Sequence, residues 1–175
     1  MRIVAGAWRG RALRAPPGLT TRPTAERLRQ ALFDMLLHAP WGGPLHGLHV
    51  LDAFAGTGAL GLEASSRGAE RAWFIERDPA ALAALRANVA ACGAGTVLVA
   101  DVLNPPPGSP CDLVFLDPPY GQDLVPRGLA ALRHAGWIAP NALVVAETAR
   151  DEAPAVGELL AERAHGAGRV SIWRS

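Results

Sequence analysis

Short apolar runs alternate with segments of helical periodicity from residue 48 to the C-terminus. The apolar runs predict strands over residues 48–53, 71–76, 96–100, 112–116, 142–147 and 170–174, and the periodic segments predict helices over residues 60–67, 79–92, 124–135 and 155–164. Strands that alternate with helices form right-handed βαβ units and therefore a mostly parallel sheet. The uninterrupted apolar runs at 113–116 and 142–146 are typical of strands buried on both faces. The pattern therefore predicts an α/β fold with helices on both faces of the sheet.

The first 40 residues follow a different pattern. Residues 1–23 contain several prolines and glycines, and residues 2–5 and 11–14 predict a short β-hairpin. Apolar residues then recur at helical spacing from residue 27 to residue 37, with Thr24 as a candidate N-cap. A Gly/Pro-rich segment, 40–47, follows as a linker. We therefore divide the chain into a basic N-terminal arm (1–40, a hairpin plus a helix) and a main domain (41–175).

Composition restricts the class of protein further. Half of the 175 residues are hydrophobic, which is enough to bury a core without disulfides or metals. The cysteines, Cys92 and Cys111, and the five histidines show no metal-ligand or redox spacing, so we predict no metal site. Neither a signal peptide nor a membrane-spanning run is visible, and no interface stripe is obvious. These features predict a cytoplasmic monomer that does not bind a membrane.

The charge is unevenly distributed, although the formal net charge is only +1. Residues 1–29 carry seven arginines and one acidic residue, whereas the remaining residues carry ten arginines and fifteen acidic residues. A basic arm on an acidic body suits a polyanionic partner held at one edge of the molecule, but a solvated arm without a partner explains the charge equally well. Trp8, between basic residues, has two equal interpretations: it stacks on an unpaired RNA base, or it packs where the arm meets the main domain.

A glycine-rich loop, Asp52-Ala53-Phe54-Ala55-Gly56-Thr57-Gly58, follows the first strand of the main domain. The glycines permit a tight turn and a close approach of a ligand to the backbone. Together with Gly61 they match the dinucleotide-binding spacing, which alone is weak evidence. A carboxylate at Asp52 would repel a pyrophosphate but suits the positively charged amino-acid end of S-adenosylmethionine. The structural alternative is that Asp52 caps the turn.

Two further acidic residues end the second and third predicted strands. Glu76 stands where the hydroxyl groups of a ribose would lie, a feature that nicotinamide enzymes and methyltransferases share. Asp101 is either an acceptor for an adenine amino group or a simple turn residue. Both positions therefore indicate a nucleoside cofactor without selecting one.

The most specific motif is Asp117-Pro118-Pro119-Tyr120, directly after the fourth predicted strand. The prolines fix the backbone and remove two amide donors, which leaves the Asp117 side chain and the Pro118 carbonyl as acceptors at the edge where α/β sheets bind ligands. Two adjacent acceptors match the two hydrogens of an exocyclic amine and stabilise the positive charge that develops as its nitrogen attacks a methyl group. Tyr120 would stack on the base. A rigid turn capped by Asp117 is the structural alternative.

These motifs, in this order, resemble those of amino-methyltransferases. The N-terminal residues resemble one particular family of them. The run Arg2–Arg11, the pattern Arg22-Pro23-Thr24-x-x-Arg27-x-Arg29, and segments 58–68 and 168–170 resemble the RsmD family of bacterial small-subunit ribosomal RNA guanine-N2 methyltransferases. The resemblance covers nearly the whole chain. It implies a Rossmann-like class I S-adenosylmethionine methyltransferase with a mostly parallel seven-stranded sheet, helices on both faces and a small basic N-terminal extension. The short proline-rich segment 104–110 departs from the family, where a helix is often found.

The resemblance implies methyl transfer from S-adenosylmethionine to the N2 amine of one guanine in 16S ribosomal RNA, within the small subunit. Asp117 is then expected to act as an acceptor and late proton sink rather than as an initial base. The expected catalytic residues are Asp117, Pro118, Pro119 and Tyr120. The expected cofactor-binding residues are Asp52, Phe54, Gly56, Thr57, Gly58, Glu76 and Asp101, and the expected RNA-binding residues are Arg2, Trp8, Arg9, Arg11, Arg22, Thr24 and Arg27.

Three alternatives remain at this point. A DNA adenine-N6 methyltransferase would share the Asp117–Tyr120 motif, but such enzymes usually carry a target-recognition domain for which this chain has no length. A nicotinamide dehydrogenase would use the glycine loop and leave that motif unexplained. A non-catalytic RNA-binding assembly factor would not need intact motifs.

Overall fold

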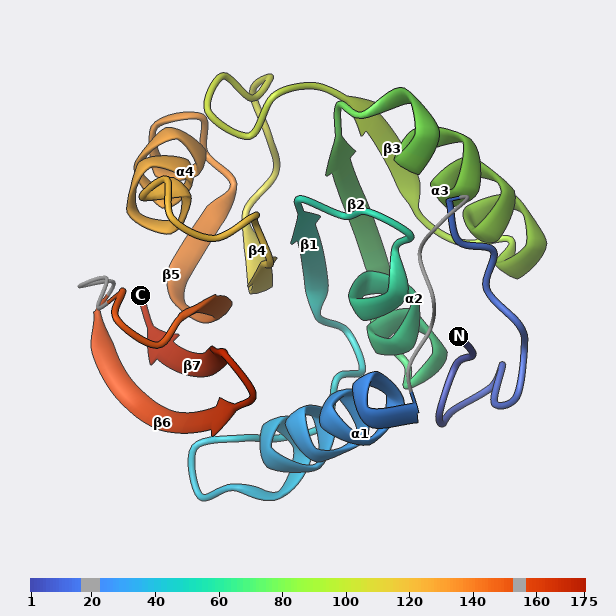
Figure 1. The fold of residues 1–175 in the computed structure, drawn as a ribbon, viewed down its shortest axis with the longest axis horizontal. Coiled ribbons are helices and arrows are strands. Elements are labelled where there is room, and N and C mark those ends of the chain that lie inside the picture. The colour runs from blue at the N-terminus through green and yellow to red at the C-terminus, as the bar shows by residue number, and fades with distance from the viewer. Residues whose placement is uncertain (17–22, 153–156) are drawn as a thin grey trace.

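The computed structural model describes residues 1–16, 23–152 and 157–175, without the side chains of residues 23 and 24. Helices and strands alternate along most of the chain (Figure 1). The helices are α1 (Pro23–His38), α2 (Ala59–Ser66), α3 (Pro79–Cys92) and α4 (Leu124–His134). The strands are β1 (His49–Ala53), β2 (Arg71–Glu76), β3 (Thr96–Val99), β4 (Cys111–Leu116), β5 (Ile138–Ala149), β6 (Glu158–His165) and β7 (Gly168–Arg174). Within the described ranges, no helix has the length and hydropathy that a bilayer crossing requires.

The seven strands form one sheet in the order β3-β2-β1-β4-β5-β7-β6. The pairings among β1 to β5 are parallel, whereas β7 runs antiparallel to both of its neighbours. The predicted mostly parallel, seven-stranded sheet is therefore confirmed. The strand order reverses between β1 and β4, and open α/β sheets bind ligands at such a point, beyond the carboxyl ends of the strands.

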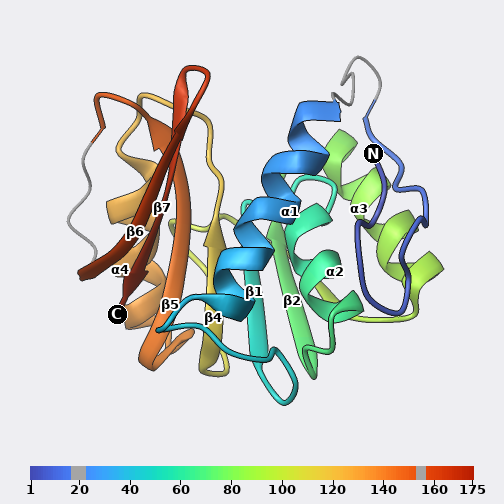
Figure 2. The same cartoon turned by 90° about the horizontal axis from the view of Figure 1, so that it is seen from below.

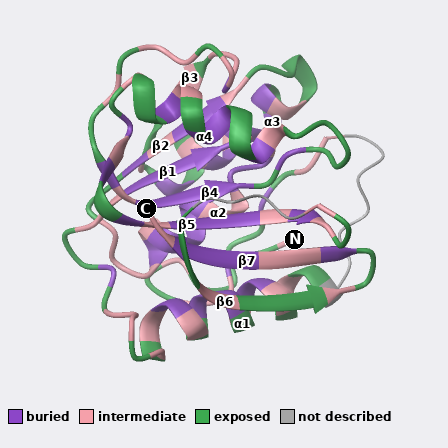
Figure 3. Ribbon diagram, turned by 90° about the vertical axis from the view of Figure 1, so that its left-hand side faces the viewer, coloured by how far each residue is buried: buried purple, intermediate pink, exposed green. Residues whose placement is uncertain are grey.

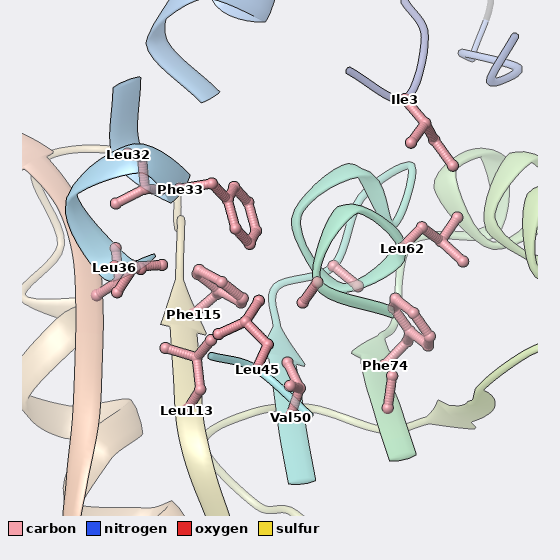
Figure 4. Close-up of a cluster of buried hydrophobic side chains, with 14 of the residues drawn as sticks. Ile3, Leu32, Phe33, Leu36, Leu45, Val50, Leu62, Phe74, Leu113 and Phe115 are labelled. Carbon is pink, nitrogen blue, oxygen red and sulfur yellow. The ribbon is translucent and has the colours of Figure 1, made fainter. Parts of the chain in front are cut away.

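Two hydrophobic cores lie on opposite faces of the sheet. On one face, α1, α2 and α3 pack against alternate strand residues, and Figure 4 shows Phe33 and Leu62 meeting Phe115 and Phe74 there. On the other face, α4 packs through Leu129 and its neighbours against the intervening residues of the same strands, whose side chains point in the opposite direction. Figure 2 shows α4 separated by the sheet from α1, α2 and α3. Successive strand residues point to opposite faces, so the continuous apolar runs serve both cores.

The end signals of α3 explain why this helix lies where the sequence predicts it. The Asp78 side chain accepts the Ala81 backbone N–H at 2.8 Å, and Pro79 occupies the first turn. Gly93 ends the helix in the left-handed conformation at φ 67. Cap and stop signals are local, which makes such a helix predictable.

The helix predicted over 155–164 is wrong wherever the structure describes it. Residues 158–165 form β6, which pairs antiparallel with β7 through a two-residue loop beginning at Gly166; residues 153–156 lie outside the description. The alanine- and glutamate-rich sequence favours a helix locally, but pairing along the whole of β7 outweighs that weak preference. As Figure 3 shows, β6 is the largely exposed edge strand.

The N-terminal arm is also less regular than predicted. Its expected hairpin is present as one isolated bridge between Arg2 and Ala12, flanked by backbone hydrogen bonds from Ile3 N–H to the Arg11 carbonyl and from Leu13 N–H to the Met1 carbonyl. Helix α1 begins at Pro23, so Thr24 lies inside the first turn and does not precede the helix as an N-cap. Proline suits that first position, because its missing N–H would have no partner there in any case.

Candidate active site

A cavity of about 790 Å³ opens at the carboxyl ends of the central strands. Its walls come from the loop after β1, the first turn of α2, the ends of β4 and β5, one side of α1 and the β6–β7 turn. A volume in this range suits a small-molecule ligand. Most of the predicted catalytic and cofactor-binding residues converge on this cavity or on its rim.

The glycine loop forms one wall. Asp52, Phe54, Gly56 and Thr57 all line the cavity. Asp52 is only 2% exposed, and its Oδ2 accepts the Gly61 backbone N–H at 2.9 Å, so the turn contact expected of the structural alternative is present as well. Burial raises the pKa of Asp52 to about 8, with smaller contributions from Asp117 and Glu76, while the Gly61 bond opposes the shift.

Two glycines, Gly58 at the end of the loop and Gly61 inside α2, allow this helix to lie close to its neighbours. A Cβ atom on Gly58, where φ is 78, would lie 2.6 Å from Leu85 Cδ1, and one on Gly61 would lie 2.5 Å from Phe74 Cε1. Gly58 is absent from the described lining of the cavity. Its role in this structure is therefore to shape the loop and to permit close packing.

Glu76 and Asp101 also lie outside the described cavity lining. Glu76 Oε2 accepts the Gly56 N–H at 2.8 Å, and its Oε1 accepts the N–H groups of Arg77 and Asp78. Asp101 pairs with the Arg77 guanidinium at 2.6 Å. Glu76 therefore shapes the glycine loop, and both carboxylates already accept hydrogen bonds from protein groups.

The Asp117–Tyr120 motif forms the opposite wall. Asp117 and Tyr120 line the cavity, whereas buried Pro118 and exposed Pro119 are not part of its described lining. Asp117 contacts solvent through the open cleft but is surrounded by protein atoms on its other sides. This partial removal from water raises the pKa of Asp117 to about 7, and the negative charge of Glu147 adds to the shift.

Glu147 and His165, which were not predicted from the sequence, stand beside Tyr120. The Tyr120 hydroxyl donates to Glu147 Oε1 at 2.5 Å, and His165 Nε2 lies 3.6 Å from Glu147 Oε2. Burial, followed by this hydrogen bond, raises the pKa of Tyr120, so its phenol stays protonated. The signal for Glu147 was available, because it ends the predicted strand 142–147 directly after the apolar run 142–146. His165 had no such signal, since it follows the segment 155–164 that was predicted to be a helix.

A buried ion cluster was missed as well. Glu63 is fully buried, accepts Arg67 Nε at 2.8 Å and lies 3.5 Å from Arg29 Nε. The same carboxylate accepts the backbone N–H groups of Val4 and Ala5. Arg29 also lines the cavity, and burial lowers its pKa. The cluster therefore joins the arm, α1 and α2 behind the site.

The predicted RNA-binding residues are spread over the arm. Arg2, Arg9, Arg11 and Arg27 are exposed; Arg2 pairs with Glu26 at 3.3 Å, and the Arg11 guanidinium donates to the Ala91 carbonyl. Trp8 is half-buried and packs against the core on the α1 face of the sheet, which favours the packing interpretation. Arg22 and the Thr24 side chain lie outside the described residues.

Comparison with known proteins agrees with this architecture. The family model described as conserved hypothetical protein 95 matches residues 1–174. Ribosomal RNA small subunit methyltransferase D of Haemophilus influenzae is 36% identical over 186 residues, which cover 100% of this chain and 94% of that protein. The enzyme of the same name from Escherichia coli K12 is 39% identical over 153 residues, which cover 85% of this chain and 74% of that protein.

Solved structures agree as well. The structure of yhhF from Escherichia coli has a TM-score of 0.86 at 35% identity, covering 99% of this chain and 97% of that chain. The rRNA methyltransferase aviRa from Streptomyces viridochromogenes has a TM-score of 0.67 at 20% identity, covering 93% of this chain and 88% of that chain, and so shows the shared fold alone. With the family model and the two curated relatives, these matches show that the chain belongs to the RsmD family of methyltransferases, the family of conserved hypothetical protein 95.

Proposed function

We propose that this protein transfers a methyl group from S-adenosylmethionine to the exocyclic N2 amine of a guanine in 16S ribosomal RNA, within the small subunit. One observation carries the proposal: Asp117 and Tyr120 face the same cavity as the glycine loop and the buried Asp52. A base held by Asp117 and Tyr120 would therefore meet a cofactor held by the glycine loop and Asp52. The names of the curated relatives support ribosomal RNA as the substrate class.

The residues around the cavity fit S-adenosylmethionine, which supplies an electrophilic methyl group on a sulfonium. Asp52 and Asp78 provide carboxylates for its cationic groups, and the buried Arg29 guanidinium provides a cation for its carboxylate. Glu76 stands at the end of β2, where its carboxylate, which accepts the Gly56 N–H, would also accept a ribose hydroxyl. The mixture of acidic and basic groups suits a zwitterionic ligand better than a pyrophosphate.

The motif after β4 accounts for the chemistry on the base. Asp117 and the Pro118 carbonyl accept the two hydrogens of the amine and stabilise the positive charge that develops on its nitrogen. The nitrogen gains the methyl group as the sulfur–methyl bond breaks and leaves a neutral thioether, and the nitrogen then loses one proton, which Asp117 accepts. A carboxyl group with a pKa of about 7 can take up that proton and return it to water at neutral pH. Tyr120, 42% exposed, offers its ring to stack on the base.

The test is transfer of tritium from labelled S-adenosylmethionine to three substrates in parallel: small ribosomal subunits that lack the modification, free 16S RNA and duplex DNA. We expect N2-methylguanine on nucleoside analysis of the ribosomal substrate. Label recovered in DNA as N6-methyladenine would overturn the substrate assignment. Saturable binding of NADH without binding of S-adenosylmethionine would overturn the cofactor assignment.

A further inference from the structure

We propose that Glu147 selects guanine over adenine by accepting a hydrogen bond from the N1–H of the target base. The inference rests on the proposed function, because it concerns the base whose amine Asp117 holds. It assigns a substrate-reading role to a residue outside the Asp117–Tyr120 motif. Nothing in that motif distinguishes the two purines, since both carry an exocyclic amine.

The sheet places Glu147 beside Asp117. Strands β4 and β5 are parallel neighbours in which Leu116 pairs with Ala146, and Asp117 and Glu147 each follow one of these partners. Adjacent strands lie about 4.8 Å apart, so Asp117, just beyond the end of β4, stands beside Glu147, which is still part of β5 and pairs with Val170. Both line the same cavity. Two neighbouring carboxylates therefore face the position of the base.

Local contacts fix the orientation of the Glu147 carboxylate. Its Oε1 accepts the Tyr120 hydroxyl, and its Oε2 lies 3.6 Å from His165 Nε2, a nitrogen without a hydrogen-bond partner in the described part of the chain. A carboxylate has about four lone-pair positions, so acceptor capacity remains. Gly168 permits this packing, because a Cβ atom there would overlap the Tyr120 hydroxyl and lie 3.2 Å from Glu147 Oε1. The carboxylate is thus held in place while it still faces the cavity.

The chemistry of the two bases then decides the selection. In guanine, the carbon that bears the exocyclic amine lies between two ring nitrogens: N1, which carries a hydrogen and donates, and N3, which carries a lone pair and accepts. In adenine, N1 is the one ring nitrogen bonded to the carbon that bears the amine, and it carries a lone pair and accepts. With the amine on Asp117, Glu147 would accept the N1–H of guanine and would face the lone pair of adenine. A site built to pair with a donor rejects an analogue that lacks it by about 10⁴-fold.

The experiment uses small subunits in which the methylated guanine, once located by nucleoside mapping, is replaced by 2-aminopurine or by adenine. 2-Aminopurine keeps the amine on C2 but has an unprotonated N1. The unmodified enzyme should prefer guanine to 2-aminopurine by at least about 100-fold in kcat/KM. In Glu147→Gln, the amide group can donate to an unprotonated N1, so this ratio should fall at least about tenfold and methylation of the adenine substrate should rise.

The control variant is Glu162→Gln, which removes an acidic residue from β6 that is absent from the described cavity lining. It should keep the ratio of the unmodified enzyme. An unchanged ratio in Glu147→Gln, in a variant that still binds S-adenosylmethionine, would overturn the role of Glu147. Equal rates of the unmodified enzyme on guanine and 2-aminopurine would overturn it without any variant. Failure of the proposed function is distinct, because the unmodified enzyme would then form no N2-methylguanine at all.

Discussion

The Glu63 carboxylate accepts the backbone N–H of Val4 at 2.7 Å, across 59 positions of sequence. The same carboxylate pairs with Arg67 and lies 3.5 Å from Arg29 Nε, so one buried charge holds the arm, α1 and α2 together. The arginine-rich N-terminal segment is therefore docked on the main domain at its first residues. The active-site cavity lies directly in front of this cluster, because Arg29 and Met1 both line it.

Replacing Glu63 by Gln should destabilise the protein strongly. The substitution leaves Arg29 and Arg67, both buried, without their counter-charge, and breaking a buried pair from one side costs about 3–5 kcal/mol. Urea unfolding of both proteins measures the difference. Glu70→Gln, at an exposed position, is the control and should change the free energy of unfolding by less than about 0.5 kcal/mol. If Glu63→Gln lowers the free energy of unfolding no more than Glu70→Gln does, the ion cluster does not stabilise the fold.

Substitutions of Asp117 should separate its two functions. Asp117→Asn keeps an acceptor oxygen but cannot take up the proton, whereas Asp117→Ala loses both. We expect kcat to fall about 100-fold or more, with Ala lower than Asn, and the Kd for S-adenosylmethionine to change little. Single-turnover methyl transfer and calorimetric binding measure the two quantities, with Asp34→Asn on the exposed side of α1 as control. Full activity of Asp117→Ala would exclude the proposed mechanism.

Cofactor affinity should rise with pH up to about 8. The pKa of Asp52 is raised to about 8, so its carboxyl group is mostly neutral below that pH in the free protein, and a cationic ligand must ionise it on binding. The Kd should therefore fall by up to about tenfold per pH unit between pH 6 and 8, with release of a proton. Calorimetry in two buffers of different ionisation enthalpy measures that proton. Asp52→Asn should abolish this proton release, whereas Asp117→Asn should keep the share of the proton release that comes from Asp52.

The stability of the free protein should show the opposite pH dependence. The pKa of Asp52 is raised in the folded state, so between about pH 4 and pH 8 its carboxyl group is ionised in the unfolded chain but still protonated in the folded protein. Each rise in pH across this range therefore favours the unfolded state, and the contribution of Asp52 to stability falls. Asp52→Asn removes this titration while its amide oxygen still accepts the Gly61 N–H. Thermal unfolding across this range should therefore show a gain for Asp52→Asn that grows with pH. A gain that is constant with pH would contradict the assignment.

A methyl group on Gly168 should impair activity more than stability. Its Cβ atom would overlap the Tyr120 hydroxyl, and Tyr120 is a half-exposed side chain that can move away at little cost to the fold. We expect kcat/KM for the ribosomal substrate to fall at least about tenfold, since small displacements in an active site are costly. The free energy of unfolding should fall by only about 1 kcal/mol. Gly43→Ala, where the added Cβ meets nothing within 4 Å, is the control.

The arginines of the arm should contribute to RNA binding through charge. Arg9 is exposed, and its replacement by Ala should weaken RNA binding regardless of sequence and reduce the slope of log K against log salt by roughly 0.7–0.9 if it contacts one phosphate. Filter binding at several salt concentrations measures the slope. Arg71 lies at the amino end of β2, whereas the cavity lies at the carboxyl ends of the strands, so Arg71→Ala should leave the slope unchanged. Equal effects of both variants would argue against the arm as the RNA-binding edge.

Elements and motifs with local signals could be predicted from the amino-acid sequence alone. The strands from β1 to β4 and the helices α2 to α4 lie close to their predicted ranges, because apolar periodicity and caps such as Asp78 and Gly93 act within one element. Strand β5 was found as well, but it spans residues 138–149 and so extends beyond the predicted 142–147 at both ends. Asp52, Asp117 and Tyr120 were found for a similar reason. Each sits at a strand end in a short motif, and parallel strands bring such ends to one edge.

The remaining features could not be predicted from local patterns, because they depend on partners that are distant in sequence. Residues 158–165 form a strand since β7 pairs with them, against their local helix preference. Glu147 and His165 join the site only when β5 and the β6–β7 turn meet the Asp117–Tyr120 motif. The charge of Glu63 is tolerated in the core because Arg29, Arg67 and two arm amides surround it. Such long-range contacts leave no periodic or local signal, because their free energy is gained only once the chain has folded.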